Sequence, residues 1–236
     1  MTTGKYAAQI LSKEKFNLSE RQISQLDIYY DLLIQKNKVM NLTAITDAEG
    51  VAIKHFYDSL TPLIYSSIDE GSTVVDVGTG AGFPSIPLLI ARPDLKLTMM
   101  DSLNKRLLFL VEVCEQLDID ANIVHSRAED AGNNKLYREK FDYAISRAVA
   151  TLPVLCEYCL PLVKLSGKFI AMKGSNADSE LNLSCNAINQ LGGEIEDVKK
   201  FELPTGEARA LIIIRKNART PSKFPRHGSK ISKESL

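Results

Sequence analysis

Residues 74–89 read VVDVGTGAGFPSIPLL, a β-branched run that is interrupted by an aspartate and then breaks into three glycines. A short apolar run bounded by glycine is typical of a buried strand followed by a tight turn. The glycine spacing is G-x-G-x-G, whereas the dinucleotide-binding fingerprint is G-x-G-x-x-G. Pro84 follows almost at once and lacks the backbone N–H that a pyrophosphate needs there. The stretch therefore predicts a binding turn for a ligand without a pyrophosphate.

Seven apolar runs predict strands, at residues 73–78, 95–101, 122–126, 141–146, 167–174, 194–203 and 208–216. Helical stretches separate the first five, and SLNKRLLFLVEVCEQL is the clearest of them. This alternation predicts a parallel sheet covered on both faces. The last two runs are too close for a crossover helix, so we expect an antiparallel hairpin at the end of the sheet. The predicted fold is α/β, Rossmann-like, with seven mostly parallel strands and an antiparallel last strand.

The first 70 residues carry helix signals and no strand signal. Ser19-Glu20-Arg21-Gln22 fits a capping box, and apolar residues then recur at helical spacing to about Lys38. Thr46-Asp47-Ala48-Glu49 repeats the cap signal before VAIKHFYDSL. We therefore divide the chain into a helical extension at 1–70, a sheet domain at 71–216 and a tail at 217–236.

The formal net charge of the chain is zero, but the charge is unevenly distributed. From Arg215 to the end there are seven basic residues and one acidic residue, a local charge of +6. Two interpretations remain open, a basic arm that contacts nucleic acid and a frayed, solvated terminus. In the first case, deletion of residues 217–236 would weaken RNA binding and leave cofactor binding unchanged.

The four cysteines and three histidines do not form a metal-binding pattern. Cys156 and Cys159 are a lone pair, and the histidines are scattered, so we expect no metal. The sequence also has no long apolar run and no signal-peptide pattern, so no membrane partner is expected. We predict a cytoplasmic chain whose free thiols pack as small hydrophobes.

Polar residues follow several predicted strands, at the edge where doubly wound sheets bind ligands. Asp76 lies in the first strand, where it suits the ammonium of an amino acid, directly or through water. Asp101 ends the second strand, where it suits two ribose hydroxyls. Ala128 and Glu129 follow the third strand and suit an adenine edge, and Arg147 closes the fourth. This set predicts one pocket for S-adenosylmethionine, with Arg147 on the cofactor's carboxylate, on RNA, or on both.

Six blocks of the sequence resemble a known family. NKVMNLTAITDAEGVAIKHFYDSL, VVDVGTGAGFPSIPL, MDSLNKR, SRAED, ISRAVA and MKG are similar to successive blocks of the ribosomal RNA small subunit methyltransferase G family, also called the glucose-inhibited division protein B family. The resemblance covers residues from about 20 to 215. One segment, GEARALIIIRK, departs from the usual family pattern after its arginine.

The resemblance implies a class I S-adenosylmethionine-dependent methyltransferase fold and methyl transfer to N7 of guanine 527 of 16S rRNA. The implied partner is 16S rRNA in the small ribosomal subunit, and we expect the chain to act as a monomer. The donor contacts that it implies, together with those predicted from the strand ends, are Asp76, Gly78, Gly80, Phe83, Asp101, Ala128, Glu129 and Arg147.

Guanine N7 carries a lone pair and no proton, so its methylation needs alignment rather than a general base. The sequence agrees with this chemistry, since it lacks the N-P-P-[YF] block that holds an exocyclic amine. Cys156 and Cys159 lie within a helical stretch and not at a strand end, where a pyrimidine methyltransferase needs its nucleophile. We therefore assign no catalytic acid or base. The residues predicted to contact RNA are Asn41, His55, Lys173 and Arg209.

Two alternatives remain at this point. A methyltransferase of a small molecule or protein would share the donor pocket, but its substrate binding would not depend on salt, unlike RNA binding. A nicotinamide-dependent dehydrogenase would bind NAD and not S-adenosylmethionine.

Overall fold

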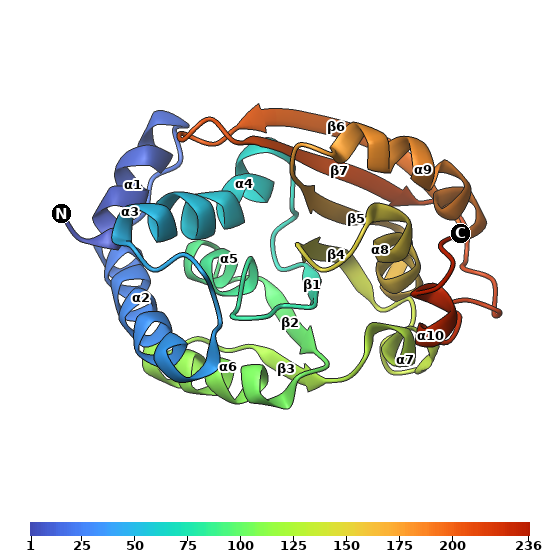
Figure 1. Cartoon of the computed structure of the whole chain (residues 1–236), viewed down its shortest axis with the longest axis horizontal. Coiled ribbons are helices and arrows are strands. Elements are labelled where there is room, and N and C mark those ends of the chain that lie inside the picture. The colour runs from blue at the N-terminus through green and yellow to red at the C-terminus, as the bar shows by residue number, and fades with distance from the viewer.

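A seven-stranded sheet runs through the middle of the molecule (Figure 1). The computed structural model describes every residue from 1 to 236. The strand order is β3-β2-β1-β4-β5-β7-β6, and β7 runs antiparallel to both of its neighbours while β1 to β5 are parallel. The strands are β1 Thr73–Val77, β2 Lys96–Asp101, β3 Asn122–His125, β4 Phe141–Arg147, β5 Val163–Lys173, β6 Gly193–Glu202 and β7 Ala208–Lys216. The predicted class, the seven strands and the terminal hairpin are all confirmed.

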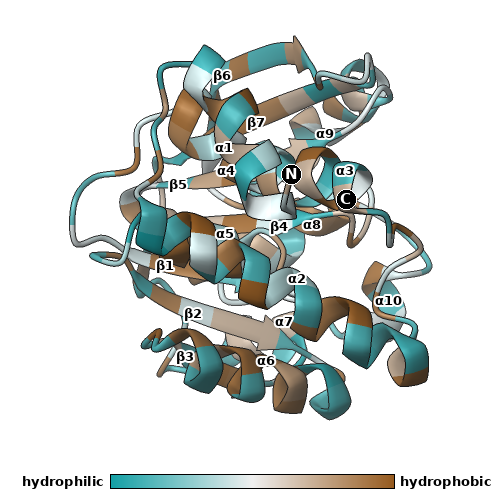
Figure 2. Cartoon of the chain, turned by 90° about the vertical axis from the view of Figure 1, so that its left-hand side faces the viewer, coloured by the Kyte–Doolittle hydropathy of each residue, from teal (hydrophilic) through white to brown (hydrophobic).

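Helices cover both faces of the sheet, with α1 to α6 on the left of Figure 1 and α7 to α10 on the right. Two hydrophobic clusters fill the spaces between the sheet and these two layers. Figure 2 shows hydrophobic and hydrophilic segments alternating along α2 and α6, as expected of helices with one buried face. The helices are α1 Thr3–Lys13, α2 Glu20–Met40, α3 Ala48–Val51, a π-helical segment Ala52–Tyr57, α4 Asp58–Tyr65, α5 Ser85–Ala91, α6 Asn104–Leu117, α7 Ala128–Asn133, α8 Leu152–Cys159, a 3₁₀ turn Leu160–Leu162, α9 Ala177–Gln190 and α10 Gly228–Ile231.

The N-terminal helices share a core with the sheet. Ser19 and Gln22 form the predicted capping box at the start of α2. Further along α2, the buried hydroxyl of Tyr29 donates a hydrogen bond to the carbonyl oxygen of Ala81, at 2.6 Å. Tyr29 also packs against Phe56 and Phe83. The helical extension therefore supports the glycine turn directly.

The C-terminal tail is folded onto the molecule, which contradicts the interpretation of a frayed terminus. Arg226 forms an ion pair with the buried Glu157 of α8, with 2.7 Å between Nη2 and Oε2. Lys216, at the end of β7, is completely buried, although it was counted with the basic tail. At least two of the seven basic side chains are thus paired inside the protein and are not available to a polyanion.

The cysteines behave mostly as predicted. Cys114, Cys156 and Cys159 are buried, and the last two lie within α8 in the core. Cys185 in α9 is exposed, so the expectation of a packed thiol was wrong there. No helix is both long enough and apolar enough to cross a membrane.

Candidate active site

The glycine turn after β1 adopts a backbone that only glycine accepts easily. Gly78 has φ of +76°, and a Cβ atom there would lie 2.5 Å from Cγ2 of Val149. The N–H of Gly78 donates to the carbonyl oxygen of Met100, at 2.8 Å, which ties the turn to β2. The turn is therefore pressed between β2 and the loop after β4, with no room for a side chain at Gly78.

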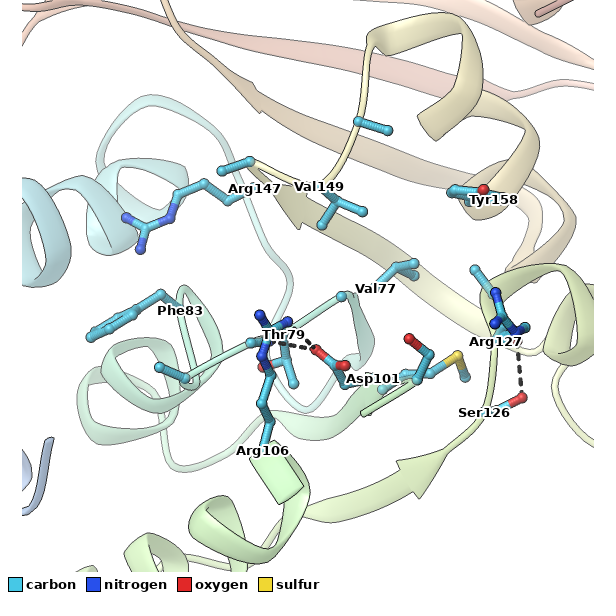
Figure 3. Close-up of a pocket in the computed structure, with 18 of the residues that line it drawn as sticks. Val77, Thr79, Phe83, Asp101, Arg106, Ser126, Arg127, Arg147, Val149 and Tyr158 are labelled. Atoms are coloured by element: carbon cyan, nitrogen blue, oxygen red, sulfur yellow. Dashed lines mark hydrogen bonds and ion pairs between the residues drawn. The ribbon is translucent and has the colours of Figure 1, made fainter. Parts of the chain in front are cut away.

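The carboxyl ends of β1, β2 and β4 open into a cavity of about 610 Å³, which we name the donor cavity. Figure 3 shows Phe83 and Arg147 on one side of it, Arg127 and Tyr158 on the other, and Asp101 between them. Of the residues predicted to bind the donor, seven line this cavity: Gly78, Gly80, Phe83, Asp101, Ala128, Glu129 and Arg147. The structure thus brings together residues that are up to 69 positions apart in the sequence.

Asp101 is held as a hydrogen-bond acceptor at the floor of the donor cavity. Its Oδ2 accepts the N–H of Gly80 at 3.0 Å, and its Oδ1 accepts the N–H of Leu103 at 2.8 Å. Arg106 approaches the same carboxylate at 3.4 Å. Because an ionised carboxylate has about four acceptor positions, both oxygens retain capacity for a ligand hydroxyl. The geometry fits the predicted ribose contact.

Asp76, which was predicted to meet an ammonium directly or through water, does not itself line the donor cavity. Its side chain is fully buried beneath the glycine turn and accepts a hydrogen bond from Ser85. Oδ1 has no partner. Burial raises the pKa of Asp76 to about 7, although the hydrogen bonds of Ser85 and Thr79 act in the opposite direction. Asp76 supports the turn from below.

An aromatic and cationic cluster closes one side of the donor cavity. The ring of His55 stacks on Phe83 with 4.4 Å between centroids, and the guanidinium of Arg147 lies 5.2 Å from the centroid of Phe83. His55 Nε2 is 2.7 Å from the hydroxyl of Thr43. Burial, with the nearby charge of Arg147, lowers the pKa of His55 to about 3, so the imidazole is neutral near pH 7. His55 sits in the π-helical segment, an irregularity that is frequent at functional sites.

A second cavity of about 410 Å³ adjoins the first, and we name it the acceptor cavity. The two share His55, Arg147 and Ala148. Lys173 and Arg209 also line the acceptor cavity, so three of the four residues predicted to contact RNA lie together. The fourth, Asn41, lies in neither cavity; it ends α2 in a left-handed conformation, and its neighbours Leu42 and Thr43 reach the donor cavity.

The charged side chains of the acceptor cavity are paired with one another. Asp58, only 4% exposed, bonds to Arg147 at 3.0 Å through Oδ2 and to Arg209 at 3.3 Å through Oδ1. Lys173, predicted to contact RNA, is bonded to Glu180 at 2.6 Å, so its ammonium already has a partner. A role for Asp58 was not predicted from the sequence, although an acidic residue inside the apolar KHFYDSL helix was a detectable signal.

The comparison with protein families decides the class. The family model described as rRNA small subunit methyltransferase G matches residues 22–211. The chain belongs to this family. A ribosomal RNA small subunit methyltransferase G from Leuconostoc mesenteroides is 48% identical over 97% of both chains. Another from Lactobacillus acidophilus is 50% identical over 92% of both. The chain is therefore a methyltransferase of ribosomal RNA.

Solved structures share the fold of this methyltransferase at low sequence identity. The YcgJ protein from Bacillus subtilis is 11% identical with a TM-score of 0.54, covering 70% of this chain and all of its own. TrmN from Thermus thermophilus is 15% identical with a TM-score of 0.52, covering 67% of this chain and 48% of its own. TYW2 from P. horikoshii, solved in complex with MeSAdo, is 13% identical with a TM-score of 0.50 over 63% of this chain and 58% of its own.

Proposed function

We propose that this methyltransferase transfers a methyl group from S-adenosylmethionine to N7 of a guanine in 16S rRNA. By the convention of the family, this is guanine 527, and the substrate is the small ribosomal subunit. The observation that carries the proposal is the donor cavity with its buried carboxylate Asp101 and bare glycine turn, joined to a second, cation-lined cavity. In this proposal the chain acts as a monomer in the cytoplasm, where ribosomal subunits are assembled.

The residues of the donor cavity fit the parts of S-adenosylmethionine. Asp101 has acceptor capacity for the ribose hydroxyls, and Ala128 and Glu129 offer a backbone N–H and a carboxylate to the adenine edge. Gly78 and Gly80 line the cavity with bare backbone, which the methionine end can approach closely. TYW2 from P. horikoshii, which shares the fold, has been solved in complex with MeSAdo. When bound, the cofactor supplies a methyl group that its sulfonium already activates.

The acceptor cavity suits a base that is methylated without proton removal. Guanine N7 offers a lone pair, so the protein has to align the base and exclude water. His55 borders both cavities and is neutral, because burial and Arg147 depress its pKa. A neutral ring adds no positive charge beside a donor that is already cationic. The displacement needs no metal ion, because the methyl carbon is already activated.

Asp58 is bonded to two arginines that could otherwise bind the base. A free guanidinium binds guanine through O6 and N7 together, which would cover the lone pair that must react. Asp58 accepts one hydrogen bond from Nη1 of Arg147 and one from Nε of Arg209, and so restrains both guanidinium groups. We infer that these arginines contribute positive charge to the cavity without blocking N7.

The proposal is tested with small subunits from a strain that lacks the gene. They are incubated with the purified chain and methyl-labelled S-adenosylmethionine, and the labelled base is mapped. We expect one methyl group per subunit at guanine N7, with binding that weakens steeply as salt rises. Label in protein or in a small molecule, with none in 16S rRNA, would refute the acceptor. Tight NAD binding without S-adenosylmethionine binding would refute the donor.

A further inference from the structure

The C-terminal tail returns along α7 and α8, the two helices that carry one wall of the donor cavity (Figure 1). We propose that residues 220–231 form a clamp that positions Glu129 and the α7–α8 wall for the donor. The inference rests on the proposed function, since it assigns the adenine end of S-adenosylmethionine to this wall. It makes the tail a part of cofactor binding, whereas the charge pattern left open a basic arm for nucleic acid and a solvated terminus.

The first point of attachment lies between the tail and the end of α7. Arg138 donates to the carbonyl oxygens of Gly132 and Phe224, both at 2.8 Å, and to that of Thr220 at 2.7 Å. Asn133 adds a bond to the carbonyl oxygen of Pro225 at 3.1 Å. One arginine thus joins α7 to two separate positions of the tail.

The second point of attachment is the ion pair with α8. Arg226 donates from its backbone N–H and from Nε to Glu157, at 2.8 and 2.9 Å, and Nη2 reaches the other carboxylate oxygen at 2.7 Å. Glu157 is 1% exposed, so a loss of Arg226 would leave a buried charge without its partner. The next residue, Tyr158, lines the donor cavity. The clamp therefore also sets the part of α8 that faces the ligand.

The third point of attachment reaches a predicted donor ligand directly. Gly228 begins α10 and lies so close to Glu129 that a Cβ atom at this position would collide with the carboxylate oxygen Oε1. Glu129 is buried and lines the donor cavity. The missing side chain of Gly228 thus leaves the space that the Glu129 carboxylate occupies. Since this carboxylate is the end of a flexible side chain, an added methyl group would move it without disturbing the fold.

The test is a double-mutant cycle in the full-length chain. S-adenosylmethionine affinity is measured by calorimetry for the wild type, Gly228→Ala, Glu129→Ala and the double variant. We expect Gly228→Ala to weaken binding about fivefold, the scale of one hydrogen bond, with little change in Tm. In the Glu129→Ala background the same substitution should cost nothing, because its target is gone. Ser232→Ala, at the C-cap of α10, removes a hydroxyl that bonds to the carbonyl oxygen of Ser229; it is the matched control and should bind like the wild type.

Three other results would contradict the inference, each for a different reason. A wild type that does not bind S-adenosylmethionine would overturn the proposed function and the clamp together. A wild type that binds, with unchanged affinity in Gly228→Ala, would overturn the clamp alone. An equal loss for Gly228→Ala with and without Glu129 would also overturn it, since the tail would then act only through general stability.

Discussion

The donor and acceptor cavities adjoin each other but differ in the chemical groups that shape them. Backbone shapes the donor cavity, through the glycine turn and the N–H groups that hold Asp101. The acceptor cavity is shaped by charged side chains that bind one another, with Asp58 between Arg147 and Arg209. A backbone site is organised by the chain itself, whereas in a site of paired charges the side chains hold one another in place. The contrast suits a small, constant cofactor on one side and a large polyanion on the other.

This contrast predicts that backbone changes in the donor cavity have the largest effects. Gly78→Ala forces a side chain into a left-handed turn and against Val149, which we expect to cost about 3 to 4 kcal/mol across stability and donor affinity. Calorimetric titration and urea unfolding separate the two contributions. Gly206→Ala is the matched control, because Gly206 has φ of +89° and no neighbour within 4 Å of an added Cβ. Equal losses of stability and affinity in both variants would show that backbone strain, and not the contact with Val149, causes the effect.

The carboxyl group of Asp76, buried beneath the glycine turn, should make stability depend on pH. Burial raises the pKa of Asp76 from 3.8 to about 7 in the folded state, so folding favours the protonated form. The stability that comes from burying the protonated carboxyl is fully present below pH 3.8 and is lost as the pH rises toward 7. The free energy of unfolding should therefore fall by about 3 kcal/mol between pH 5 and 8. Asp76→Asn should remove this dependence, as measured by urea unfolding across the range. Parallel pH curves for the wild type and the variant would contradict the shift.

Removal of the Asp101 carboxylate should weaken the donor by about 1 to 3 kcal/mol, because ligand hydroxyls and two backbone N–H groups lose their acceptor. The dissociation constant of S-adenosylmethionine for Asp101→Ala measures this loss. Asp118→Ala removes an exposed carboxylate that pairs with Arg21 and should leave affinity unchanged. An unaltered constant for Asp101→Ala would remove this residue from the site.

A change in the acceptor cavity should slow methylation of the subunit with little effect on cofactor affinity. Asp58→Asn frees Arg147 and Arg209 to compete for N7, so we expect kcat/KM for subunit methylation to fall about tenfold while donor affinity changes less than about twofold. Single-turnover methylation and calorimetry give the two values. Asp178→Asn, which breaks an exposed pair with Lys200, is the control. A parallel loss of donor affinity would place Arg147 on the cofactor.

The smallest effect should come from the titration of His55. Burial and Arg147 hold its pKa at about 3, far below the ordinary value of 6.5, so the ring stays neutral across the working range. We expect kcat/KM from pH 5 to 8 to show no His55 inflection near 6.5, with the same profile shape in His55→Gln. An inflection that disappears in this variant would show that the imidazole is solvated and exchanges protons during the reaction.

The sequence by itself determined the sheet and most of the donor cavity. Strand and helix periods are local, and parallel strands bring their carboxyl ends to one edge, so Gly78, Asp101 and Arg147 could be placed together in advance. Burial is not local, so the position of Asp76 in its strand could not show that the glycine turn covers it.

Only the tertiary structure decided how the charged residues are used. Asp58 reaches Arg209 across 151 positions, and Lys173 meets Glu180 from a neighbouring element. The tail looked like a basic arm because charge can be counted in a sequence, while ion pairing cannot. Glu157 and Arg226 are 69 positions apart, and only the folded chain brings them into contact. Pairing depends on the final positions of distant side chains, so composition showed how much charge the chain carries, and the fold decided how much of it remains free.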